Sequence, residues 1–195
     1  MKILAINGSP RLIGNTTNIV GDFLDRLNRD GFETEQEQIY GYDLEPCNDC
    51  RTCEMRGDGR CINEEDGFND TLDKLRQADG IVLAAPAYQG TTPCVMRNFL
   101  ERAGLVLSVS DKGLRGKVGC ALTVCAHDGG DTAYAELIRW MMQAQMVVVG
   151  AAPAPVFRAL NSPQYAEDKD AVKGMDNLAE NFSWAVRNLA DKRER

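Results

Sequence analysis

The chain has 195 residues, of which 44% are hydrophobic, so it is long enough and apolar enough to form one compact domain with a substantial core. Its 29 acidic and 22 basic residues give a formal net charge of -7, which disfavours binding to the phosphate backbone of a nucleic acid. No apolar run reaches the roughly 18 residues that a membrane-spanning helix needs. These properties predict a cytoplasmic protein without nucleic-acid or membrane partners.

Short apolar runs alternate with amphipathic segments along the whole chain, the pattern expected of a parallel sheet covered by helices. The expected strands are residues 2–7, 33–39, 80–85, 117–125 and 146–150. The expected helices are residues 16–30, 64–78, 93–104, 132–145 and 171–190. The second strand is the most polar, so we place it at an edge of the sheet. Right-handed crossovers then predict a doubly wound, three-layer α/β sandwich with five parallel strands.

Two long segments, residues 40–63 and 151–167, lack a regular apolar pattern. Loops of this length in compact domains are usually functional or disordered. The second segment is rich in alanine and proline, yet it also contains Phe157, Leu160 and Tyr165. Because these side chains are too apolar for a solvated loop, we expect the second segment to pack either on a second subunit or on its own domain.

The loop between the first strand and the first helix has the composition of an anion-binding site. It brings hydroxyls, backbone amides and the guanidinium of Arg11 to the positive end of a helix dipole. It lacks the Gly-Lys-Ser/Thr ending of a nucleoside triphosphate loop and the Gly-x-Gly-x-x-Gly spacing of a dinucleotide site, so a single phosphate monoester fits best. The alternative is a capped helix, with Asn15 or Thr16 as the N-cap.

This loop, which begins Gly-Ser-Pro-Arg and ends Gly-Asn-Thr-Thr, resembles the first loop of the flavodoxin-like family of NAD(P)H-dependent FMN reductases. A second match begins at Pro86 after the third strand, and a third covers residues 126–131 after the fourth strand. The resemblance implies a flavodoxin-like sheet of order 2-1-3-4-5 with FMN at its carboxyl edge. It implies that the FMN phosphate is held by Ser9, Arg11, Asn15, Thr16 and Thr17. It implies that the flavin ring and ribityl chain are lined by Pro86, Ala87, Tyr88, Gln89, Gly90, His127, Gly129 and Gly130.

His127 is the only histidine in the chain. A flavin accepts hydride with little help from protein acids, so we expect His127 to be a structural or pocket-wall residue rather than an acid or base. The chemistry is expected to be carried by the flavin, with no catalytic side chain.

Four cysteines crowd together in the first irregular segment, three of them at successive Cys-x-x-Cys spacings: Cys47, Cys50, Cys53 and Cys61. Four thiolates in a short loop can hold a [4Fe-4S] cluster. Zinc is the lesser alternative, because structural zinc sites usually use two separated Cys-x-x-Cys knuckles. The segment resembles the iron-sulfur flavoproteins, a branch of the same family. Cys120 and Cys125 are expected to pack as small apolar residues. Cys94 opens a helix beside the second loop, where the alternative is a thiol that ionises more readily than usual, but packing in the interior is the preferred expectation.

Together these features predict a single domain over residues 1–195, with a cysteine-rich insertion at about 44–63 and a C-terminal helix at about 171–190. The resemblance implies an FMN-dependent oxidoreductase that passes electrons from a donor, expected to be NAD(P)H, to a small-molecule or protein acceptor. It also implies a homodimer or homotetramer. Two alternatives stay open, a flavodoxin-type electron carrier without substrate turnover and a zinc-stabilised binding module.

Overall fold

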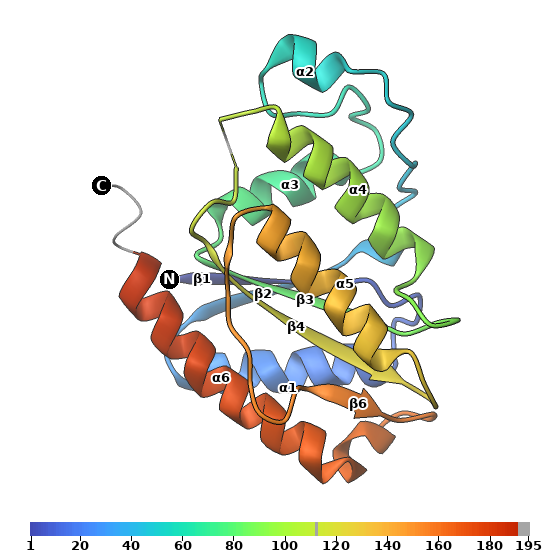
Figure 1. The fold of residues 1–195 in the computed structure, drawn as a ribbon, viewed down its shortest axis with the longest axis vertical. Helices are drawn as coiled ribbons and strands as arrows, with labels where there is room; N and C mark the ends of the chain where they lie inside the picture. Colours follow the sequence, from blue (N-terminus) through green and yellow to red (C-terminus); the bar gives the residue numbers. More distant parts are fainter. Residues whose placement is uncertain (112, 191–195) are drawn as a thin grey trace.

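The computed structural model describes residues 1–111 and 113–190. Helices cover both faces of a central parallel sheet (Figure 1). Across the sheet the strands are β2 (Glu33–Gln38), β1 (Lys2–Asn7), β3 (Gly80–Pro86), β4 (Val118–Cys125) and β5 (Val147–Val148). This order, 2-1-3-4-5, confirms the predicted doubly wound α/β sandwich.

The three central strands are mostly apolar because each is buried on both faces. In β1, Ile3 and Ala5 point into one core, whereas Leu4 and Ile6 point into the other. The polar strand β2 pairs in parallel with β1 and lies at the edge of the sheet, as predicted.

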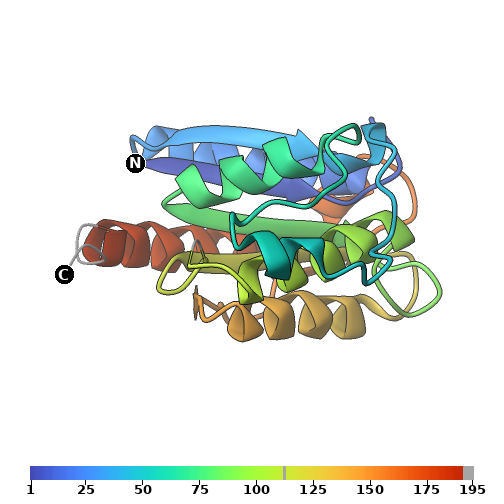
Figure 2. The ribbon, with the colours of Figure 1, turned by 90° about the horizontal axis from the view of Figure 1, so that it is seen from above.

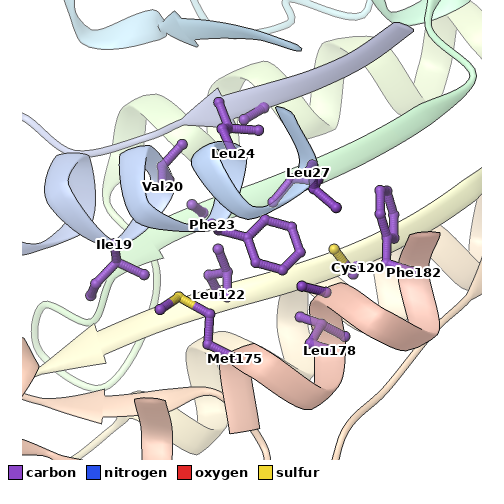
Figure 3. Packing of buried hydrophobic residues seen from close by; sticks show 14 of the residues in the cluster. Ile19, Val20, Phe23, Leu24, Leu27, Cys120, Leu122, Met175, Leu178 and Phe182 are labelled. Atoms are coloured by element: carbon purple, nitrogen blue, oxygen red, sulfur yellow. The ribbon is translucent and has the colours of Figure 1, made fainter. Parts of the chain in front are cut away.

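One core lies between the sheet and two helices, α1 (Asn15–Arg29) and α6 (Lys169–Leu189). Figure 3 shows α1 and α6 packed beside each other over β4. Phe23 and Phe182 pack edge to face there, with 6.1 Å between ring centroids. Cys120 is fully buried in this core, and its burial raises the pKa of the thiol well above the ordinary value. Its predicted packing as a small apolar residue is confirmed.

The opposite core lies beneath α3 (Phe68–Gln77), α4 (Cys94–Ser108) and α5 (Gly130–Gln143). Cys125, in β4, is buried as predicted. Cys94 is exposed at the first residue of α4, so the prediction that it packs in the interior is wrong.

The fifth strand differs from the prediction of one strand over residues 146–150. β5 pairs with the start of β4, and a separate strand, β6 (Val156–Arg158), pairs with the end of β4. Pro153 and Pro155 lie between them and have no backbone N–H to donate to a sheet ladder, which explains the interruption.

The segment over residues 151–167 packs on its own domain. It contains β6 and a 3-10 turn, η2 (Gln164–Glu167). Phe157 is fully buried, and Tyr165 is buried beside it with 6.0 Å between ring centroids. The domain's own core therefore accounts for most of the apolar character of this segment, and Leu160 alone of its three large apolar residues is exposed.

The cysteine-rich segment lies outside the sheet. After the 3-10 turn η1 (Ile39–Gly41), it contains the short helix α2 (Thr52–Arg56) between irregular stretches. Figures 1 and 2 show this segment against α3 and α4, away from α1 and α6. Within the described residues, no helix combines the length and the apolar character needed to cross a membrane.

Candidate functional site

Three loops meet at the carboxyl edge of the sheet, because β1, β3 and β4 are neighbouring parallel strands. The loops that follow β3 and β4 touch directly. A Cβ atom on Gly129, whose φ is +76°, would lie 2.6 Å from Cα of Gly90, so only glycine allows this approach. The loop after β1 contacts the start of α4, where a Cβ on Gly8 would lie 2.8 Å from Cβ of Met96. The structure thus brings the three predicted loops together.

The first loop is shaped by its own polar side chains. Asn7, buried at the end of β1, accepts from the backbone N–H of Ser9 at 2.9 Å and donates to Oγ1 of Thr17 at 3.1 Å. The N–H of Arg11 donates to Oγ of Ser9 at 3.1 Å. Gln38, at the end of β2, donates to the carbonyls of Ser9 and Arg11 at 3.0 and 2.8 Å. Sequence reasoning missed Asn7 and Gln38, although each is a polar residue that ends a strand at this edge.

The amino end of α1 is open to a ligand. Its N-cap is Gly14, and no side chain caps the first turn, so the alternative with Asn15 or Thr16 as the N-cap is wrong. Asn15 is buried, and its Oδ1 has no hydrogen-bond partner among the described protein atoms. Arg11 is exposed in the loop before this end. Free N–H groups at a helix end and a nearby guanidinium suit a phosphate, and a buried acceptor suits a hydroxyl donor.

The second loop forms a tight turn. The N–H of Tyr88 donates to the carbonyl of Thr91 at 2.8 Å, and the N–H of Thr91 donates back at 3.3 Å. Gln89 and Gly90 form the tip, with φ values of +52° and +82°. Pro86 is buried in β3, whereas the side chains of Tyr88 and Gln89 are exposed at the edge of the sheet.

A carboxylate on α5 fixes the far end of this turn. One oxygen of Glu136 accepts from Oγ1 of Thr91 at 2.8 Å and from both Oγ1 and N of Thr92 at 3.0 and 3.2 Å. These three bonds tie the second loop to the helix that follows the third loop. Sequence reasoning missed Glu136, because a glutamate on a helix surface gives no local signal.

The third loop contributes an exposed side chain, His127, and two glycines that are required by protein packing. Gly129 meets the second loop, and a Cβ on Gly130 would lie 2.6 Å from a methyl group of Val156 and 2.9 Å from Sγ of Cys125. The two glycines therefore let the third loop and α5 sit close to the second loop and to β6.

The four clustered cysteines line one cavity of about 310 Å³ between the cysteine-rich segment and α4. All four are free thiols. Within the described residues, no three Cys, His, Asp or Glu side chains are grouped closely enough to hold a metal ion, so the thiols share a cavity without converging on one point. The donor chemistry of the cavity fits a group with four thiolate ligands.

A buried arginine connects this cavity to α4. Arg102 donates to the carboxylate of Asp66, to the carbonyl of Glu45 at 3.0 Å and to Sγ of Cys61 at 3.2 Å. Its guanidinium carbon also lies 4.1 Å from the centre of the Phe68 ring. Burial acts to lower the pKa of Arg102, but its hydrogen bonds to Asp66 and Cys61 outweigh burial and raise that pKa. The sequence gives one indication of this buried arginine, because Arg102 is a charged residue among the apolar positions of the helix predicted over residues 93–104.

The sheet order and the loops at its carboxyl edge define a flavodoxin-like fold. RosB, solved with a bound riboflavin-phosphate intermediate, superposes with a TM-score of 0.75 at 20% identity over 98% of this chain and 81% of its own. A flavodoxin from the domain Archaea superposes with a TM-score of 0.62 at 18% identity over 96% of this chain and 99% of its own.

Sequence comparison gives the family. The model of the NADPH-dependent FMN reductase family matches residues 1–156, and the chain belongs to this family. An iron-sulfur flavoprotein of Methanosarcina thermophila is 36% identical over 152 residues, which are 77% of this chain and 78% of that protein. An iron-sulfur flavoprotein of Methanocaldococcus jannaschii is 34% identical over 152 residues, 77% of this chain and 76% of that protein.

Proposed function

We propose that this protein is an FMN-dependent oxidoreductase of the iron-sulfur flavoprotein type, which passes electrons from a reduced donor to a small-molecule or protein acceptor. The observation that carries this proposal is the uncapped amino end of α1, preceded by Arg11 in the same loop at the carboxyl edge of the sheet. Membership of the FMN reductase family and the iron-sulfur flavoprotein relatives support it.

The phosphate of FMN binds at the first loop. Arg11 and the free N–H groups of the first turn of α1 supply positive charge and donors, and Ser9, Thr16 and Thr17 line the same site. The resemblance assigns Asn15 to the phosphate, but its unpartnered Oδ1 can only accept a hydrogen bond, so we assign it instead to a ribityl hydroxyl of FMN. The flavin ring lies against the second and third loops, on the residues Pro86, Ala87, Tyr88, Gln89, Gly90, His127, Gly129 and Gly130. Bound FMN supplies the redox chemistry, taking two electrons as hydride and releasing them singly.

The four cysteines hold a [4Fe-4S] cluster. Their shared cavity and free thiols suit a group with four thiolate ligands. The names of the relatives favour a cluster over zinc. A cluster transfers one electron at a time, so a cluster and a flavin in one protein convert between two-electron and one-electron transfer.

NAD(P)H is the proposed donor, supported by the family name. We place the protein in the cytoplasm, where a reducing environment keeps cysteines as thiols.

Anaerobic purification followed by cofactor analysis tests the proposal. We expect released flavin that co-elutes with FMN on chromatography, iron and acid-labile sulfide in about a four-to-four ratio for a cubane cluster, and steady-state oxidation of NADH or NADPH with an added acceptor. Bound FMN without turnover would instead favour a flavodoxin-type carrier. One zinc without iron or flavin would favour a zinc-stabilised binding module.

A further inference from the structure

Arg102 is a buried cation in direct contact with one of the cysteines of the proposed cluster site. Its side chain is 3% exposed and that of its ion-pair partner, Asp66, is 5% exposed. The two residues come from different parts of the chain, since Arg102 lies on α4 and Asp66 lies two residues before α3. The third partner, Cys61, belongs to the cysteine-rich segment.

The ion pair is already complete without the contact to sulfur. Asp66 also accepts hydrogen bonds from the N–H of Phe68 at 3.3 Å and from the side chain of Asn63 at 3.3 Å, so its carboxylate is well satisfied. Burying two charges costs solvation free energy, and apolar residues of similar volume often stabilise a protein equally well. The additional N–H that Arg102 directs at Cys61 therefore calls for an explanation beyond stability.

Arginine suits this position because its guanidinium is a planar fork with five donors. Nη1 of Arg102 donates to Asp66 and to the carbonyl of Glu45, while Nη2 donates to the sulfur of Cys61. Lysine would supply a point charge without this division of donors.

We propose that Arg102 raises the reduction potential of the [4Fe-4S] cluster through Cys61, and that Asp66 limits this effect. The inference rests on the proposed function, because it requires the cluster. Reduction adds one negative charge to a cluster, so a positive charge and an N–H donor at a ligand sulfur stabilise the reduced form. The negative charge of Asp66 opposes it, and both effects are strong because the pair is buried. Arg102 is thus a positioning and tuning residue that acts through Cys61.

Two substitutions should shift the potential in opposite directions. Arg102→Gln removes the positive charge and should lower the midpoint potential of the cluster. Asp66→Asn removes the negative charge and should raise it, while the carbonyl of Glu45 and the ring of Phe68 keep Arg102 in place. Arg76→Gln is the matched control, since Arg76 donates to the carbonyl of Gly59 at 2.6 Å and the substitution thus removes an arginine that bonds the backbone of the same segment.

The measurement is a potentiometric titration with dithionite, monitored by electron paramagnetic resonance, on the anaerobically purified full chain. Iron and sulfide are quantified in each variant. Shifts of opposite sign in the first two variants, with no shift in Arg76→Gln, support the proposal. If Arg102→Gln fails to fold or loses its cluster, the test depends on Asp66→Asn alone: a raised midpoint potential supports the proposal, and an unchanged or lowered one contradicts it.

The two ways in which this experiment can fail are distinguishable. A wild type that contains no iron or sulfide overturns the cluster and therefore the proposed function. A wild type with a full cluster, whose midpoint potential is unchanged in Asp66→Asn and in a cluster-bearing Arg102→Gln, overturns only the role of Arg102. A merely structural role of the ion pair would lower stability in both variants and leave the potential unchanged.

Discussion

Arg11 provides the most direct residue-scale test of the phosphate site. Its guanidinium lies in the loop that leads into the open end of α1, and a charge-assisted hydrogen bond of this kind contributes roughly 1.5 to 3 kcal/mol. Arg11→Ala should therefore weaken FMN binding to the apoprotein at least about tenfold, measured by quenching of flavin fluorescence.

Two controls sharpen this prediction. Riboflavin lacks the phosphate, so its affinity should be the same for the wild type and for Arg11→Ala. Arg29→Ala removes an exposed arginine from the opposite end of α1 and should leave FMN affinity unchanged. If Arg11→Ala and the wild type bound FMN with equal affinity, Arg11 would not be part of the phosphate site.

A second residue-scale prediction concerns Tyr165, whose hydroxyl donates to Asp22 at 2.7 Å. Burial and this hydrogen bond raise the pKa of Tyr165 from 10.0 to about 12. The folded state holds the hydroxyl proton of Tyr165 more tightly than the unfolded state does. The stabilisation that this hydroxyl gives the folded state is therefore complete below pH 10 and is lost as the pH rises toward 12.

The free energy of unfolding should therefore fall between pH 10 and 12 more steeply in the wild type than in Tyr165→Phe. The slopes should differ by at most about 1.4 kcal/mol per pH unit, the value for one proton. Urea unfolding from pH 7 to 12 measures this, and below pH 9 the stability difference between the two proteins should be constant. A difference that stays constant up to pH 12 would contradict the raised pKa.

At the scale of elements, the cysteine-rich segment and the first loop should act independently. The segment packs on α4 through Arg102, whereas the phosphate site is built from β1 and α1. Cys53→Ala should thus lose most iron and sulfide yet keep FMN affinity, as metal analysis and flavin titration would show. Cys94→Ala, which removes an exposed thiol outside the segment, should keep both cofactors. Full iron content in all four single alanine variants of the clustered cysteines would refute the cluster.

The strands and the loops after them could be predicted because their signals are local. An apolar run indicates a strand that is buried on both faces. The order of such strands determines which loops lie together at the carboxyl edge of the sheet. The division of the last strand into β5 and β6 could not be predicted from apolarity, since Val156 and Phe157 follow a proline-rich stretch and pair with β4 only in the folded sheet. The pair of Arg102 and Asp66 is likewise a tertiary contact, between residues that are 36 positions apart.

For the whole molecule, α4 links the two proposed cofactor sites. Met96, in its first turn, packs against Gly8 of the first loop, and Arg102 contacts Cys61. These two positions are six residues apart, about 9 Å of helix. A rigid helix therefore fixes the cysteine cavity relative to the carboxyl edge of the sheet within one subunit.

The final prediction, also for the whole molecule, is that the protein is a homodimer or homotetramer. The first and second loops expose apolar side chains at the carboxyl edge of the sheet, with Leu12 71%, Ile13 86% and Tyr88 39% exposed. A flavin ring on these loops would be covered from one side only, and a second subunit over the same edge would bury both the ring and these side chains. Light scattering at micromolar concentration should give the mass of two or four chains. Ile13→Glu should lower that mass, because it places a charge in the contact, whereas Trp184→Glu, at an exposed position on α6, should not. A flavin-loaded monomer in the wild type would contradict this assembly.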